Sequence, residues 1–260
     1  MLTEQLEIRN KQKDSWNTFS PGWKKWDDFT MEFLQSQGEQ IIEALDLRVS
    51  RGLVTATDIA EGMLEIAREK QLARNLDNFY TLTADVCELP FEDHSFDAIS
   101  CRLGFMFFPD MEQAAREMVR VLKPGGKIAT TVWAEPGHNR WITAMMGAVK
   151  SVVEMPAPPL GAPGMFRCAQ PGILSALFEK AGLFGGREVD ITGRMNCKTL
   201  DQYWEFMNDV VPPVVAVIKS SDQSVKNQIR RQLYCTLLDG NGQPKELTYG
   251  ARLFTAQKAG

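Results

Sequence analysis

Apolar residues are arranged along this chain in two alternating patterns. Short apolar runs bounded by polar residues predict buried strands, and apolar stripes at helical spacing predict amphipathic helices. We expect strands at 53–57, 78–86, 95–103, 127–134, 187–196 and 251–258. We expect helices at 3–19, 38–47, 61–72, 111–122, 168–183, 199–218 and 222–239, and one more entered through Asp27 and Asp28.

Turn-forming residues separate these segments. Ser20-Pro21-Gly22 predicts a turn between the first two helices, and the Lys-Pro-Gly-Gly stretch at 123–126 predicts a helix end followed by a turn. Strands and helices alternate between residues 53 and 134. This alternation predicts an α/β protein with a parallel sheet covered on both faces.

Composition and charge are those of a soluble globular protein. Hydrophobic residues make up 44% of the 260 residues, charged residues 24%, and the formal net charge is −4. A slight acidic excess argues against a broad nucleic-acid-binding face, which needs clustered lysine and arginine. The N-terminus does not resemble a signal peptide, and no apolar run approaches the ~20 residues that cross a bilayer. We therefore expect no nucleic-acid partner and no membrane span.

Cysteine usage favours a reducing, cytoplasmic environment. The five cysteines are scattered, odd in number and never spaced as CxxC, and the chain has only two histidines. We therefore expect neither a disulfide framework nor a metal site. The expected free thiols are Cys87, Cys101, Cys168, Cys197 and Cys235.

Two acidic residues follow predicted strands. Asp58 closes the strand at 53–57, and Asp85 closes the next one. At the carboxyl edge of a parallel sheet, Asp58 can accept hydrogen bonds from ribose hydroxyls, and Asp85 can accept one from an exocyclic amine while the Val86 N–H donates to a ring nitrogen. An aspartate that caps a helix or forms a turn is at least as common, so either acid alone is a weak signal.

Aromatic residues gather after the third and fourth core strands and near the N-terminus. The loop after the strand at 95–103 is apolar, which suits the floor of a pocket. Trp16, Trp23 and Trp26 either fix the N-terminal segment to the core or form a lid over a ligand. The pocket candidates, which core packing explains nearly as well, are Phe105, Met106, Trp133, Trp141 and Phe166.

Three segments resemble one known family when they are taken together. "TDIAEGML" (57–64), "ADVCELPFEDHSFDAISCR" (84–102) and "REMVRVLKPGGKIATTVW" (116–133) are similar in order and spacing to motifs of class I S-adenosylmethionine-dependent methyltransferases. The quinone-biosynthesis (UbiE-like) type is the most similar. The resemblance covers about residues 16–190. It implies a Rossmann-like, doubly wound, mostly parallel sheet with helices on both faces, N-terminal helices and a helical lid insertion.

The resemblance also assigns the cofactor site. Asp58 would hold the ribose of S-adenosylmethionine, and Ile59 and Met63 would flank its adenine. The other implied contacts are Ala84, Asp85 and Val86 at the adenine edge, and Cys101 and Arg102 near the methionine end.

The family's glycine-rich strand–turn–helix is not found in this sequence. It belongs before the strand that carries Asp58, but the helix tail joins that strand directly at Arg48-Val49, and such a unit takes about 25 residues. Three explanations are open. The chain as given lacks a segment of the complete protein, the protein is shortened and its N-terminal helices or a partner chain fill the gap, or it is a degenerate relative without catalysis.

The implied reaction moves a methyl group from a sulfonium to a small, apolar or aromatic acceptor by in-line displacement, with S-adenosylhomocysteine as product. A base is needed only if the acceptor must lose a proton. His138, in "EPGHNRW", is a weak candidate for this base because it follows a strand end.

Functions of two other classes remain open. A dehydrogenase of similar layout also needs a glycine fingerprint, and none is visible. A methyltransferase-fold scaffold or binding module predicts no affinity for the cofactor. In either case we expect an N-terminal helical segment at 1–48, a core at 49–260 with a lid or acceptor region around 135–235, and a cytoplasmic protein that allows a homodimer.

Overall fold

The computed structural model describes residues 3–47, 52–156, 159 and 161–260. Each strand expected from the sequence has its counterpart among these residues, and strands alternate with helices as expected, so the α/β class is confirmed. The strands are β1 (Val54–Asp58), β2 (Phe79–Thr83), β3 (Phe96–Arg102), β4 (Leu122–Trp133), β5 (Leu183–Arg194) and β6 (Thr248–Lys258).

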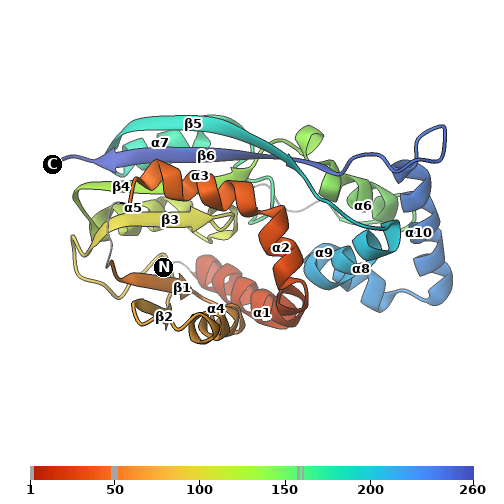
Figure 1. Cartoon of the computed structure of the whole chain (residues 1–260), viewed down its shortest axis with the longest axis horizontal. Coiled ribbons are helices and arrows are strands. Elements are labelled where there is room, and N and C mark those ends of the chain that lie inside the picture. Colours follow the sequence, from red (N-terminus) through yellow and green to blue (C-terminus); the bar gives the residue numbers. More distant parts are fainter. Residues whose placement is uncertain (1–2, 48–51, 157–158, 160) are drawn as a thin grey trace.

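The six strands form two separate sheets. β1 pairs in parallel with β2, and the second sheet has the order β3-β4-β6-β5. β3 and β4 are parallel, whereas β6 is antiparallel to both of its neighbours. In the described part of the chain no strand joins β1 to β3, so each of these two strands keeps one unpaired edge (Figure 1). The junction at Arg48-Val49, where the sequence lacks a strand, lies outside the described residues.

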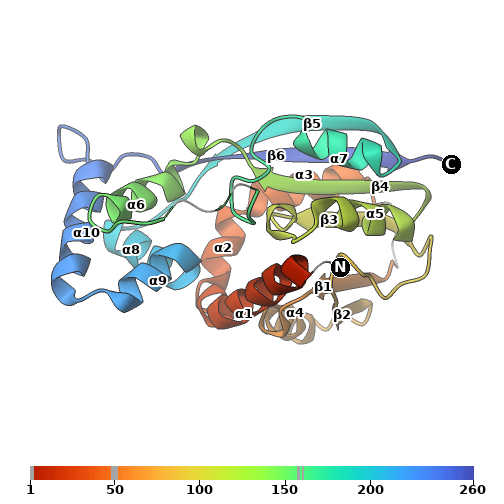
Figure 2. The same cartoon turned by 180° about the vertical axis from the view of Figure 1, so that it is seen from behind.

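Helices cover both faces of the larger sheet. α3 (Gln35–Leu45) lies on one face, and α5 (Met111–Val121) and α7 (Ile173–Lys180) lie on the other, which Figure 2 shows from behind. α4 (Glu61–Ala73) packs against the smaller sheet. The doubly covered α/β sheet expected from the alternating pattern is therefore present.

The prediction of a turn at Ser20-Pro21-Gly22 is wrong. α1 (Thr3–Lys25) continues through Pro21, and α2 (Asp27–Phe33) begins only after Trp26. Gly22 allows α1 to pack closely against the backbone at Asp209, because a Cβ added at Gly22 would lie 2.1 Å from the carbonyl oxygen of Asp209. Contact with another helix therefore fixes this segment, and the local turn chemistry is overridden.

Several other boundaries differ from the sequence prediction, and two of them have a clear physical reason. The helix before residue 122 ends where expected, but the Lys-Pro-Gly-Gly stretch belongs to β4, because the Gln257 side chain and the Ala259 carbonyl both bond to Gly125. The helix expected at 199–218 is divided into α8 (Leu200–Val210) and α9 (Pro212–Ser220), since two consecutive prolines lack the N–H groups that would continue α8.

The helices α6 (Arg140–Lys150), α8, α9 and α10 (Gln223–Leu237) gather at one end of the molecule (Figure 1). Short 3₁₀ turns, η1 (Phe105–Phe107) and η2 (Pro136–His138), follow β3 and β4. One hydrophobic core runs from α3 across the larger sheet into this helical end. Among the described residues, no helix is long and apolar enough to cross a membrane.

All five cysteines are free thiols, as expected. Burial raises the pKa of Cys87 and of Cys197 to about 12, and that of Cys168 to about 11. These three thiols are therefore protonated at neutral pH and act as small apolar side chains.

Candidate functional site

The carboxyl ends of β1 and β2 bring the two predicted acids together. Asp58 is the register partner of Thr83, and the Ala84 N–H donates to the Asp58 carbonyl oxygen at 3.0 Å. Asp85 follows directly. The acids therefore lie on one edge of the smaller sheet, and we call Asp58, Asp85 and the backbone between them the acid rim.

The segment that follows β3 contacts the same rim. The Cys87 thiol, two residues after Asp85, donates to the Asp110 carbonyl oxygen at 3.5 Å, and the Gln113 side chain donates to the Cys87 carbonyl oxygen at 3.2 Å. The loop after β2 and the segment after β3 are therefore in contact, although no strand among the described residues connects the two sheets. We treat the ends of β1, β2 and β3 as one candidate site.

Asp58 is a desolvated carboxylate. Its Oδ1 accepts the Ala60 N–H at 2.8 Å, just before α4 begins. Burial raises the pKa of Asp58 more than its backbone donors lower it. The turn-forming role considered from the sequence is thus present, and the other carboxylate oxygen can still accept from a ligand hydroxyl.

Asp85 carries an unsatisfied oxygen. The Cys87 N–H donates to Asp85 Oδ1 at 2.9 Å, whereas Oδ2 is buried without a hydrogen bond. An Arg9 nitrogen lies 3.6 Å from Oδ2. Buried carboxylate oxygens without a donor are rare, so this atom is suited to a ligand that brings an N–H group.

The helix α1 covers the acid rim, a role that sequence reasoning missed. Besides the Arg9 contact, the Asn17 side chain accepts the Gly62 N–H of α4 at 3.0 Å, and the rings of Trp16 and Phe107 pack edge to face at 5.2 Å. Trp16 thus fixes the N-terminal helix to the loop after β3. The polar spacing along α1 gives no signal that would have identified Arg9 or Asn17.

The remaining cofactor candidates lie at the same edge. Ile59, Met63, Ala84 and Val86 are all half-buried, which leaves part of each side chain accessible. Arg102, the last residue of β3, is open to solvent in part.

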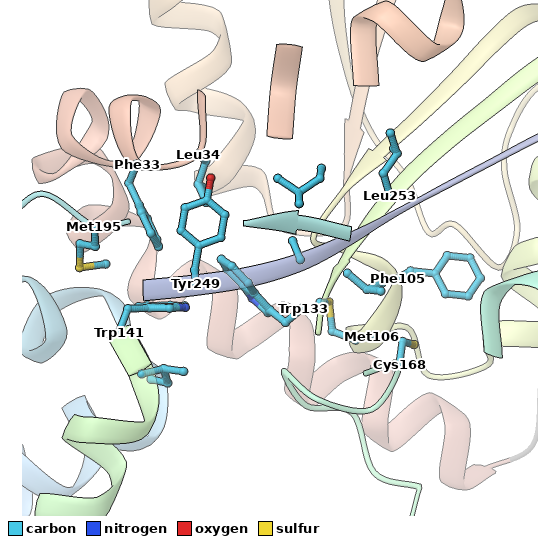
Figure 3. Packing of buried hydrophobic residues seen from close by; sticks show 14 of the residues in the cluster. Phe33, Leu34, Phe105, Met106, Trp133, Trp141, Cys168, Met195, Tyr249 and Leu253 are labelled. Atoms are coloured by element: carbon cyan, nitrogen blue, oxygen red, sulfur yellow. The ribbon is translucent and has the colours of Figure 1, made fainter. Parts of the chain in front are cut away.

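Most of the predicted substrate-pocket residues are part of the core. Phe105 and Met106 are fully buried, and Trp133 and Trp141 keep 4% and 5% of their surface exposed (Figure 3). Phe166 is half-buried. Trp133 and Trp141 pack against one another and against Phe33 and Tyr249. Packing, the alternative considered from the sequence, accounts for these positions.

His138 lies on the wall of a cavity at the far side of the larger sheet. This cavity measures about 560 Å³, and no acid-rim residue lines it. The imidazole is 67% exposed, and its Nδ1 lies 3.9 Å from a Glu135 carboxylate oxygen. Backbone groups, two acidic side chains, one arginine and several hydroxyl groups line this cavity. The lining residues are Ala134, His138, Asp190–Arg194, Glu246 and Thr248–Ala251.

Part of this chain is similar to known methyltransferases. Residues 37–130 match the model of a family described as a methyltransferase domain. The demethylmenaquinone methyltransferase of Listeria monocytogenes serotype 4a (strain HCC23) is 41% identical over 90 residues, which are 35% of this chain and 38% of that protein. The protein of the same name from Staphylococcus haemolyticus (strain JCSC1435) is 40% identical over 87 residues, 34% of this chain and 36% of its own length. The chain thus matches little more than a third of these relatives.

Two solved structures share the fold. The YcgJ protein from Bacillus subtilis superposes with a TM-score of 0.55 at 18% identity, over 87% of this chain and 99% of that one. A protein from Thermotoga maritima is titled a SAM-dependent methyltransferase and possible histamine N-methyltransferase. It superposes with a TM-score of 0.53 at 16% identity, over 94% of this chain and 99% of that one. At such identities the likeness extends to the fold alone.

Proposed function

We propose that this chain, whose residues 37–130 match a family model described as a methyltransferase domain, binds S-adenosylmethionine at the acid rim and transfers its methyl group to a small acceptor. The observation that carries the proposal is that Asp58 and Asp85 lie on one edge of the smaller sheet and that the loop after Asp85 contacts the segment after β3. The matched segment includes all of these residues.

The residues at the rim fit the nucleoside part of this cofactor. The Asp58 carboxylate can accept hydrogen bonds from ribose hydroxyls. Asp85 Oδ2, which has no hydrogen-bond partner in the protein, can accept one from the adenine amine. Ile59 and Met63 supply the apolar surface that an adenine ring needs. When bound, S-adenosylmethionine supplies an electrophilic methyl group, so that the protein's main contribution is to position the two reactants and exclude water.

We propose a small apolar or aromatic acceptor, because the similar proteins from Listeria monocytogenes and Staphylococcus haemolyticus are named demethylmenaquinone methyltransferases. Phe105 and Met106 do not contribute to this argument, since both are fully buried in the core. His138 is the candidate base from the sequence, but it lines a cavity to which no acid-rim residue contributes, so we assign no base to the reaction.

Isothermal titration with S-adenosylhomocysteine tests the proposal. We expect one binding site per chain and no binding of NAD. Asp58→Asn should weaken binding about tenfold or more, because a carboxylate that accepts ligand hydroxyls loses charge-assisted hydrogen bonds. Asp97→Asn is the matched control, since Asp97 lies on β3 with 80% of its side chain exposed and should leave affinity unchanged.

The split sheet favours a second candidate, a methyltransferase-fold binding or scaffold module without catalysis. Among the residues that the structure describes, β1 and β3 each keep an unpaired edge, which is unusual for strands in the middle of such a fold. Absence of heat with every nucleoside ligand would favour this candidate. An intact mass well above the 29.2 kDa of this chain would instead reveal residues that close the gap.

A further inference from the structure

The smaller sheet has an unpaired edge on the outside of the molecule. β2 pairs with β1 on one side, and both views show β1 between β2 and the larger sheet (Figures 1 and 2). Among the described residues no strand pairs with the other side of β2. The Asn78 carbonyl and the Ala84 N–H bond to β1. Because the direction of these groups alternates along a strand, the main-chain groups of Phe79, Thr81 and Thr83 point to the unpaired side. We call this side of Phe79–Thr83 the β2 edge.

The β2 edge lacks the features that normally prevent edge strands from pairing. Its five residues, Phe79-Tyr80-Thr81-Leu82-Thr83, include no charged residue and no proline, and their register with β1 is regular. β5, the outer strand of the larger sheet, contains several charged residues and a register shift between Phe184 and Arg187. Charges and bulges of this kind protect an edge. The β2 edge is therefore able to accept a further strand, whereas β5 is protected.

Exposed apolar side chains gather around the β2 edge. More than half of the large hydrophobic side chains that are exposed in the described part of the chain lie between residues 53 and 82, namely Leu53, Val54, Leu72, Leu76, Tyr80 and Leu82. The Thr81 and Thr83 hydroxyls bond to Arg68 and Glu61 of α4. Since side chains alternate along a strand, Tyr80 and Leu82 lie on the face opposite α4, 53% and 38% exposed. An exposed apolar patch of this kind is typical of an interaction surface.

We propose that the β2 edge pairs with the β2 edge of a second copy of this chain, antiparallel and about a two-fold axis at Thr81. In this register Tyr80 of each copy lies opposite Leu82 of the other, and a cross-strand pair of an aromatic and an aliphatic side chain is favourable. Two marginal two-stranded sheets become one sheet of four strands. Both edges are used in the contact, so association stops at two copies.

The groups beside the β2 edge are compatible with a second copy. The Arg68 Nε donates to the Thr81 hydroxyl at 2.7 Å and so lies near the proposed axis, but its charge is paired with that of Glu61. The Gln71 side chain donates to the Phe79 carbonyl oxygen at 2.7 Å, which leaves this oxygen a second lone pair. An identical uncharged strand therefore meets no unpaired like charge along the five residues of β2. The contact is small, so we expect a reversible dimer with a dissociation constant of roughly 10–100 μM.

Sedimentation equilibrium of the full chain, over a concentration series that spans this range, tests the proposal. The average mass should rise from 29.2 kDa toward twice that value. Tyr80→Lys and Leu82→Glu should each weaken self-association about tenfold or more, because each places a charge opposite an apolar side chain. Val189→Lys is the matched control, since Val189 is 50% exposed on β5, and it should leave the association unchanged.

The double variant Tyr80→Lys/Leu82→Glu tests the register. Antiparallel pairing centred on Thr81 places its two new charges, which have opposite signs, across from each other in both halves of the contact. We therefore expect association within about threefold of wild type. Circular dichroism should show that all four variants are folded, because the substituted side chains are exposed. If both single variants weaken association and the double variant does not recover it, the register is wrong and the proposal is overturned.

Hydrogen exchange adds a second readout. The amides of Phe79, Thr81 and Thr83 should exchange more slowly as the protein concentration rises, because pairing gives their N–H groups acceptors. A constant mass of 29.2 kDa across the series would overturn the proposal, and so would equal effects of Tyr80→Lys and Val189→Lys. Growth beyond two copies would contradict a closed two-fold contact. Association is measured without a ligand, so its outcome does not depend on the proposed function.

Discussion

The Asp58 carboxylate has a structural role besides the binding role that we propose for it. One oxygen accepts the Ala60 N–H and so fixes the turn into α4. The same carboxylate is desolvated, which raises its pKa and makes its charged form costly in the folded protein. A ligand that donates hydrogen bonds to it would offset this cost, as is common where stability is given up for binding.

Asp58→Asn should therefore stabilise the free protein near neutral pH. The folded carboxyl group has a higher pKa than the unfolded one, so its stabilising contribution is complete below the unfolded pKa and is lost as the pH rises through the folded pKa. The asparagine keeps an oxygen for Ala60 but carries no charge. Melting curves from pH 4 to pH 7.5 should show that the melting temperature of Asp58→Asn rises relative to that of the wild type as the pH increases.

Asp97→Asn provides the control for this pH series, since its exposed carboxylate should give a small and nearly constant difference. A clear loss of stability for Asp58→Asn at neutral pH would contradict the account, because it would mean that the charged carboxylate is net stabilising without a ligand.

At the scale of single elements, the apolar pattern predicted the positions of the strands, although only β4 and β6 are largely buried. The errors came where tertiary contact decides the outcome. Pro21 lies inside α1 because Gly22 packs against Asp209. Gly125 lies in β4 because the end of β6 bonds to it. A prediction from the proline and glycine positions alone cannot take account of Asp209 or of the end of β6, because both lie far away in the sequence.

The last residues of β6 also hold the end of α5 in place. The Lys258 ammonium donates to the carbonyl oxygens of Val119 and Leu122 at 2.6 and 2.7 Å. Carbonyls at a helix C-terminus lack partners within the helix, and a cation there also interacts favourably with the helix dipole. This contact ties the C-terminal strand to a helix more than a hundred residues earlier in the chain.

Lys258→Met should lower the free energy of unfolding by about 1–3 kcal/mol, the usual contribution of hydrogen bonds to a charged group. Urea unfolding measures the change. Lys219→Met, at an exposed lysine near the end of α9, should change it by less than about 0.5 kcal/mol. Equal effects of the two substitutions would show that the Lys258 contacts contribute nothing beyond an exposed lysine.

The two sheets should differ in stability at the scale of the whole molecule. β1 and β2 form a two-stranded sheet with exposed apolar residues such as Leu53, Val54 and Tyr80, whereas β4 and β6 are largely buried. Two-stranded sheets are marginal without further packing. Amides of β1 and β2 should therefore exchange with deuterium at a lower opening free energy than those of β4 and β6.

Uniform protection across both sheets would show instead that the protein opens as one cooperative unit, and would contradict the interpretation of β1, β2 and α4 as a separate, weaker part. The exchange should be measured on the free protein, because a ligand that contacts both sheets would couple them.

The sequence was informative about the acid rim because its residues follow strand ends in a recognisable order. It was less informative where the site depends on distant helices. Arg9 and Asn17 reach the rim only because α1 packs across it. The apolar loop was interpreted as a pocket, yet Phe105 and Met106 are completely enclosed.

Deuterium exchange with and without S-adenosylhomocysteine tests most directly whether the two sheets bind one nucleoside together. We expect added ligand to slow exchange at 58–63 and 84–88 on the smaller sheet and at 101–106 after β3, with little change in the helical end formed by α6 and α8–α10. Protection confined to one sheet, or no protection in either, would contradict a shared site at their carboxyl ends.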